Sequence, residues 1–120
     1  MFKTLTLLKR RPDLSMEEFV RRYETGHAVL GERLLKGAAT RYVRRYLHPV
    51  SNPETGAVEE AEHDVAMEIW YPDRATWEAT MARLSTPEIM AEIVADEETL
   101  FDRSRNRFFL IEERESDLGA

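Results

Sequence analysis

The chain has 120 residues, of which 42% are hydrophobic and 33% are charged, and its formal net charge at pH 7 is −6. This composition is typical of one globular domain, and the acidic balance argues against binding to nucleic acid or to an anionic membrane surface. The absence of cysteine excludes disulfides, thiolate nucleophiles and cysteine-ligated metal centres. With no signal-peptide pattern and no membrane-length apolar run, we expect a single cytoplasmic domain over residues 1–120.

The first predicted elements are a strand over residues 2–10 and a helix that begins at Ser15. Ser15 and Glu18 have the spacing of a capping box, in which each side chain bonds a backbone amide near the helix start. Apolar and aromatic residues then recur on one helix face, and His27 continues that face four residues after Tyr23. Gly26 is expected to loosen or end the helix, or the helix continues to Gly37, a suitable residue for its C-terminal end.

The rest of the chain reads as three strands, two helices and one long loop. Strands are predicted over residues 40–48, 64–71 and 106–113, with a loop at 50–63 and a charged tail from 114 to 120. Asp73 is placed to cap a helix over 74–84, and Pro87 suits the first turn of the next one. In that last helix, apolar residues recur at helical spacing up to Phe101, and the acidic run 96–98 is expected on its solvent side.

This order of elements predicts an α+β, ferredoxin-like βαββαβ fold with a four-stranded antiparallel sheet and helices on one face. The opposite sheet face is expected to be polar, yet both faces carry large apolar groups. We therefore predict that a second copy covers it, so that two sheets close into a dimeric α+β barrel. The residues assigned to the helix-facing core are Leu5, Leu7, Val43, Leu47, Val65, Met67 and Ile69. Those assigned to the barrel interior are Thr4, Thr6, Tyr42, Arg44, Tyr46, His48, Glu68 and Trp70. For strand 40–48 the opposite assignment, with Arg41 and Arg45 pointing inward, stays open.

The residues that precede His27 resemble the EthD family. The matching features are a lysine-bearing strand, the run Pro-Asp-Leu-Ser-Met-Glu-Glu-Phe at 12–19, and an aromatic residue four positions before a histidine. Glu-Ile-Trp-Tyr at 68–71 is similar to a later family segment, and so is the stretch from Ala95 to Asp102. The resemblance implies a dimeric, ferredoxin-like α+β barrel over nearly the whole chain. It leaves the activity open, because relatives include dehydratases and decarboxylases of aromatic polyketides.

The first functional hypothesis is a cofactor-independent lyase (dehydratase) or isomerase that acts by acid–base chemistry on a small aromatic or cyclic, polyketide-like or catabolic substrate. An imidazole titrates near neutral pH, so His27 is the candidate base, with Tyr23 and Glu68 as further catalytic groups. Candidate substrate-binding residues are Tyr42, Arg44, Tyr46, His48, Trp70 and Asp102. Structural alternatives stay open: Glu68 paired with a strand arginine, Trp70 as packing, and Asp102 as a turn residue.

The second hypothesis is a non-catalytic, dimeric module that binds a small hydrophobic or aromatic ligand, or an accessory protein of a degradation or biosynthesis pathway. It needs the same aromatic lining but no proton carrier. We expect no cofactor and no metal, since no glycine-rich phosphate loop and no spaced metal-ligand motif occurs in the sequence. Haem ligation by His27 or His48 is a weaker alternative.

Overall fold

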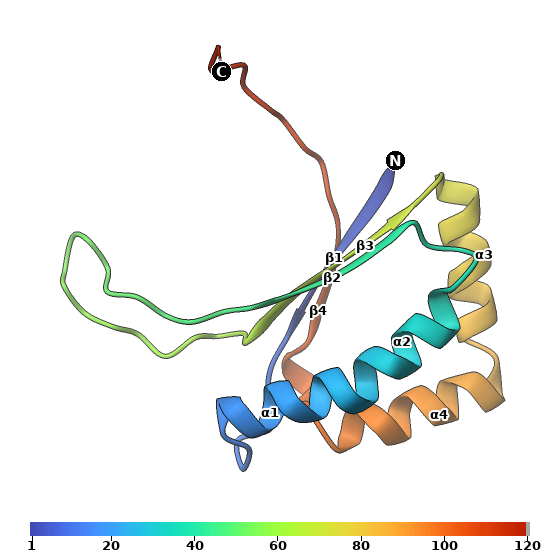
Figure 1. The fold of residues 1–120 in the computed structure, drawn as a ribbon, viewed down its shortest axis with the longest axis horizontal. Helices are drawn as coiled ribbons and strands as arrows, with labels where there is room; N and C mark the ends of the chain where they lie inside the picture. Colours follow the sequence, from blue (N-terminus) through green and yellow to red (C-terminus); the bar gives the residue numbers. More distant parts are fainter. Residues whose placement is uncertain (120) are drawn as a thin grey trace.

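The computed structural model describes residues 1–119 as one antiparallel sheet with four α-helices on one side of it (Figure 1). In chain order the elements are β1 (Phe2–Leu8), α1 (Met16–Arg22), the π-helical turn η1 (Tyr23–His27), α2 (Ala28–Leu35), β2 (Arg41–Tyr46), β3 (Val65–Tyr71), α3 (Arg74–Leu84), α4 (Pro87–Glu98), the 3₁₀ turn η2 (Arg103–Arg105) and β4 (Arg107–Leu110). The strand order is β2-β3-β1-β4, with every neighbouring pair antiparallel. The predicted ferredoxin-like α+β fold is confirmed.

Local signals explain where the helices begin. The Ser15 hydroxyl accepts the Glu18 amide at 3.1 Å, as expected for a cap. The reciprocal half of the capping box does not form, because the Glu18 carboxylate instead binds Arg21 at 2.6 Å on its own helix. Asp73 caps α3, and Pro87 occupies the first turn of α4. The first helix does not end at Gly26 but passes through η1 into α2.

The register between β2 and β3 decides which side chains face the helices. Directly opposed residues of neighbouring strands point to the same sheet face. The paired residues are Tyr42 with Ile69, Arg44 with Met67 and Tyr46 with Val65. Val65 is fully buried in the core under the helices, so Tyr42, Arg44 and Tyr46 also face the helices. Their predicted place in the barrel interior was wrong, as was the core position of Val43, which pairs with Glu68 on the uncovered face. The alternative assignment, in which Arg41 and Arg45 point toward the predicted barrel interior, is the observed one, because both lie on the uncovered face of the sheet.

Strand β1 is also reversed relative to the prediction. Leu8 belongs to the buried core and Thr6 is buried on the same side, whereas Leu5 opposes Glu68 and Leu7 opposes Ala66 on the uncovered face. Leu5 and Leu7 are more hydrophobic than Thr4 and Thr6, yet they lie on the uncovered face. Hydrophobicity alone does not identify the helix-facing side when both faces of a sheet are apolar.

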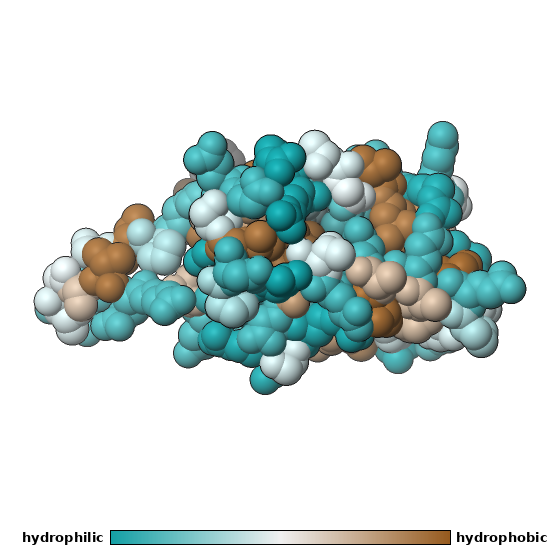
Figure 2. All heavy atoms as spheres, turned by 90° about the horizontal axis from the view of Figure 1, so that it is seen from below, coloured by the Kyte–Doolittle hydropathy of each residue, from teal (hydrophilic) through white to brown (hydrophobic). Residues whose placement is uncertain are grey.

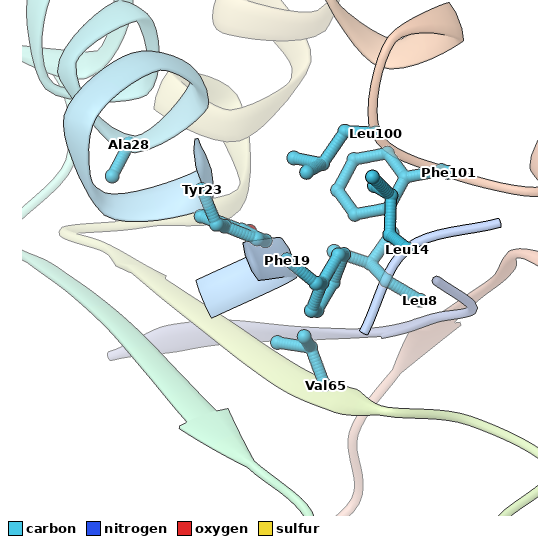
Figure 3. Close-up of a cluster of buried hydrophobic side chains, with 8 residues drawn as sticks. All are labelled: Leu8, Leu14, Phe19, Tyr23, Ala28, Val65, Leu100 and Phe101. Carbon is cyan, nitrogen blue, oxygen red and sulfur yellow. The ribbon is translucent and has the colours of Figure 1, made fainter. Parts of the chain in front are cut away.

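The main core lies where α1 and η1 cross the sheet (Figure 3). Its buried members are Leu8, Leu14, Phe19, Tyr23, Ala28, Val65, Leu100 and Phe101. The last two follow the end of α4 at Glu98, so the helix is shorter than its apolar spacing predicts, while these side chains still pack in the core.

A buried ionic network fastens the end of β1 to the start of β3. The Lys9 ammonium lies 3.5 Å from the Asp64 carboxylate and donates to the Ala61 carbonyl at 2.8 Å. Asp64 also accepts the Arg10 amide at 2.9 Å, and the Lys9 amide donates to Asn106 at 2.9 Å. Both Lys9 and Asp64 are buried, and each has one further ionic partner, because Glu60 lies 3.7 Å from the Lys9 ammonium and Arg10 lies 3.8 Å from the Asp64 carboxylate.

The segment between β2 and β3 projects away from the rest of the molecule (Figure 1). Hydrophobic atoms appear on this projection in Figure 2, and its exposed apolar residues include Val50 and Val58. Within residues 1–119, none of the helices has the length and apolar character needed to cross a bilayer.

Candidate functional site

The π-helical turn places the family histidine beside the core. Within η1 the Ala28 amide bonds the Tyr23 carbonyl, five residues back instead of four. Such insertions occur often at functional sites, because the extra residue re-aims the side chains that follow. The His27 ring lies edge-on to Tyr23 with centroids 5.1 Å apart, and edge-on to Phe101 with centroids 5.2 Å apart. Two buried aromatic rings therefore restrict the orientation of the imidazole.

A carboxylate on α4 binds the same imidazole. The distance from His27 Nδ1 to Asp96 Oδ2 is 2.5 Å, and both side chains are partly buried. The predicted solvent-side position of Asp96 was wrong, because α4 packs against η1 and turns this residue toward the histidine. A carboxylate in this position favours the tautomer with the proton on Nδ1, which leaves Nε2 able to accept a proton.

His27 lines an apolar cavity of about 140 Å³ between the sheet and helices α2, α3 and α4. Its other polar lining residues are Tyr42, Tyr71 and Glu97. The remaining wall consists of Leu30, Gly31, Leu34, Leu35, Met67, Ile69, Met81, Leu84 and Ile93. An apolar space with a few polar groups at its wall is the usual form of a small-molecule site.

Tyr71, the last residue of β3, is a polar member of this wall and was not among the predicted site residues. Its side chain is fully buried, and its hydroxyl has no hydrogen-bond partner among the described residues. Burial raises the pKa of Tyr71 to about 12, so the hydroxyl keeps its proton at neutral pH. Strand alternation was a usable signal, because Tyr71 continues the side of the strand that carries Val65, Met67 and Ile69.

Tyr42 lies against the backbone of α2 at Gly31. A Cβ atom at Gly31 would come within 2.9 Å of the Tyr42 ring, so only glycine allows this close approach. Burial raises the pKa of the Tyr42 hydroxyl, which therefore also remains protonated at neutral pH.

Arg44 and Tyr46 share the helix-facing side of β2 with Tyr42 but are bound to Glu24 of η1. Arg44 donates two hydrogen bonds to the Glu24 carboxylate, at 2.8 and 2.7 Å, and the Tyr46 hydroxyl donates to the same carboxylate. The Arg44 guanidinium holds the pKa of Glu24 below its ordinary value. Neither side chain lines the cavity beside His27. Tyr23 is completely buried, and burial raises the pKa of its hydroxyl.

Glu68 and Trp70 face the other way, on the uncovered side of the sheet. Glu68 accepts the Trp70 indole N–H at 2.7 Å and lies 3.5 Å from Arg45, the ion pair considered in the sequence analysis. The Trp70 ring lies between the Lys3 ammonium, 3.9 Å from a ring centroid, and the Arg41 guanidinium at 4.7 Å. The sheet therefore separates Glu68 and Trp70 from His27, and the structure does not bring these three residues together.

The last two candidates lie elsewhere again. His48 is exposed and lines a second, open hollow of about 570 Å³ beside the projecting segment. Asp102 occupies the turn before η2, where its carboxylate accepts the Ser104 hydroxyl at 2.7 Å and its amide donates to the Lys9 carbonyl at 2.9 Å. Among residues 1–119, no three histidine or acidic side chains are grouped so as to hold a metal ion.

Comparison with known proteins agrees with this fold and with the sequence resemblance. A variant of SnoaB, described as a cofactor-independent oxygenase from Streptomyces nogalater, is 10% identical with a TM-score of 0.55 over 99% of this chain and 97% of that one. A protein from Arabidopsis thaliana has a TM-score of 0.61 at 11% identity, over 98% of this chain and 100% of that one. A dimeric ferredoxin-like protein from an uncultured marine organism has a TM-score of 0.56 at 19% identity, over 94% of this chain and 96% of that one.

At these identities the structural likeness establishes the fold alone, whereas a family model establishes the family. The EthD domain model matches residues 11–104, so the chain belongs to the EthD family. A search of curated proteins finds no sequence match.

Proposed function

We propose that the protein is a cofactor-independent lyase (dehydratase) or isomerase that acts on a small aromatic or cyclic substrate in the cavity beside His27. The observation that carries this proposal is the 2.5 Å pair of His27 and Asp96 at the wall of an apolar cavity. The description of SnoaB as a cofactor-independent oxygenase supports the possibility of chemistry on this fold without a bound cofactor.

The first step of both reactions is removal of a proton from a carbon beside a carbonyl group. His27 Nε2 accepts that proton, and the electron pair moves onto the carbonyl oxygen. Asp96 is a positioning residue, which holds the imidazole and stabilises the imidazolium that forms. The Tyr42 and Tyr71 hydroxyls, both protonated at neutral pH, donate hydrogen bonds to the developing oxyanion. Return of the proton from His27 to another carbon completes an isomerisation. In a dehydration, the enolate electron pair re-forms the carbonyl and a carbon–carbon double bond forms, while the neighbouring hydroxyl takes the proton from His27 and leaves as water.

The test follows this shared step and does not require the natural substrate. Cyclohexanone in D₂O exchanges the hydrogens beside its carbonyl, and NMR measures the rate of exchange. We expect catalysed exchange with the native protein and a loss of about 100-fold or more in His27→Asn, the usual size of a general-base contribution. His48→Asn is the matched control, because His48 is exposed and outside this cavity. Asp96→Asn is expected to lower kcat with little change in KM.

Two results would contradict the catalytic proposal. If His27→Asn exchanges the ketone as fast as the native protein, His27 is not the base and the catalytic proposal fails. Saturable ligand binding without any exchange in the native protein would favour the non-catalytic binding module.

We also propose that two copies pack their uncovered sheet faces together into a barrel. This face carries the apolar side chains of Leu5, Leu7, Val43, Trp70 and Phe109, and none of the helices within residues 1–119 lies on it (Figure 1). The similar protein described as dimeric has the same fold. Leu7→Lys places a charge on this face opposite Ala66 and Arg107, where no directly opposed acidic residue compensates it, so we expect it to convert a dimer to a monomer in sedimentation. A native protein that sediments as a monomer at high concentration would contradict the proposal.

A further inference from the structure

The cavity beside His27 is small enough to limit the size of its ligand. Its volume is about 140 Å³. An engineered apolar cavity of about 150 Å³ in another protein holds benzene, so this volume suits one six-membered ring. Most of its wall is aliphatic, which favours a flat or compact apolar body.

The charges around the cavity limit the ligand further. Within the described part of the chain, no lysine or arginine lines it, and its acidic neighbours are Glu97 and the Asp96 that binds His27. Arg83 lies nearby, and its guanidinium donates to the Leu34 carbonyl at 2.5 Å. A carboxylate ligand would lose its hydration without gaining a cation in the wall, so it is disfavoured.

The polar side chains that line the cavity favour a ligand that carries an oxygen atom. The Tyr71 hydroxyl is buried and unpartnered among the described residues. A buried hydroxyl of this kind is costly unless something bonds it, and a ligand oxygen that reaches it would supply the missing partner. The Tyr42 side chain and His27 line the same space.

We propose that this site selects an uncharged compound with a single six-membered ring and at least one hydroxyl or carbonyl oxygen. The inference rests on the cavity assigned under the proposed function and narrows its substrate class. The contact of Gly31 with Tyr42 sets the width of the site, because any larger residue at position 31 displaces the tyrosine ring.

The test measures binding of four probes by calorimetry at pH 7: phenol, toluene, benzoate and 2-naphthol. We expect saturable binding of phenol at least tenfold tighter than that of benzoate or 2-naphthol. In Tyr71→Phe, phenol should bind about fivefold more weakly, with toluene unchanged, since only phenol can use the lost hydroxyl. Equal binding of benzoate and phenol would overturn the charge argument, and equal binding of 2-naphthol would overturn the size argument.

Two variants in α2 separate an effect on the site from an effect on the helix. Gly31→Ala and Val29→Ala both place an alanine, the best helix former, in this helix. A Cβ at Gly31 meets the Tyr42 ring, whereas the Val29 side chain is exposed and does not line the cavity. We expect Gly31→Ala to weaken phenol binding by about tenfold or more and Val29→Ala to leave it unchanged. Equal effects would contradict the assignment of Gly31.

The outcomes of these measurements are distinct from those of the exchange assay. Selective phenol binding without ketone exchange supports the ligand class and rejects the catalytic proposal. Ketone exchange that depends on His27, with no preference among the four probes, supports catalysis and rejects the ligand class.

Discussion

Replacing Tyr71 by phenylalanine should stabilise the protein, although most substitutions of buried residues destabilise. The change removes only the hydroxyl, which is buried without a hydrogen-bond partner in the described structure, and keeps the ring. An unsatisfied buried polar group costs about 1–3 kcal/mol, so we expect the free energy of unfolding to rise by about 1–2 kcal/mol. At about 2.1 cal/mol/K per residue, a chain of 120 residues gains about 4 °C in Tm per kcal/mol.

Tyr46→Phe is the matched control for this prediction. The Tyr46 hydroxyl donates to the Glu24 carboxylate, so the same chemical change removes a formed hydrogen bond. We expect it to lower the free energy of unfolding by about 1 kcal/mol. Urea unfolding of the native protein and both variants, followed by circular dichroism, measures the two effects. A loss of 1 kcal/mol or more in Tyr71→Phe would show that its hydroxyl is bonded in solution, and the reasoning would be wrong.

Asp64→Asn should lower the free energy of unfolding by about 3 kcal/mol, since it removes the buried countercharge of Lys9 and leaves only the exposed Glu60 carboxylate, 3.7 Å away, to compensate the ammonium. Urea unfolding checks this, and the double variant with Lys9→Met should lose less than the sum of the single losses; full additivity would disprove the coupling. The lowered pKa of Glu24 predicts a stability contribution that is complete above the ordinary glutamate value of 4.5 and is lost as the pH falls through the lowered value. Between pH 7 and pH 3, the Tm of Glu24→Gln should therefore fall less than the Tm of the native protein in thermal unfolding. An equal fall of Tm with pH in both proteins would refute the assignment.

The same face of the sheet carries residues of the hydrophobic core and residues of the candidate site. The helix-facing side of β2 and β3 carries both the core residue Val65 and the cavity residues Tyr42 and Tyr71. An unsatisfied hydroxyl on this face costs stability, and such costs are tolerated where a ligand repays them. The predicted rise in the free energy of unfolding of Tyr71→Phe and its predicted loss of phenol affinity therefore have the same cause, the removal of the Tyr71 hydroxyl.

Local and periodic features of the chain could be predicted from the sequence because they depend on neighbouring residues. The caps at Ser15 and Asp73, the proline in the first turn of α4 and the residues that share a side of each strand follow from hydrogen bonding and backbone geometry within a few positions. The element order then leaves few topologies, and the ferredoxin-like sheet is the one observed. The spacing around His27 likewise identified the family that the domain model confirms.

Only the tertiary structure decided which strand side faces the helices and which groups meet His27. Alternation groups Tyr42 with Tyr46, but the side they face depends on register with β3, a contact between residues far apart in sequence. The pairing of His27 with Asp96 spans 69 positions and requires the π turn and the packing of α4. Hydrophobicity could not replace this information, because both faces of the sheet are apolar and a side chain's partners are fixed by packing across the whole chain.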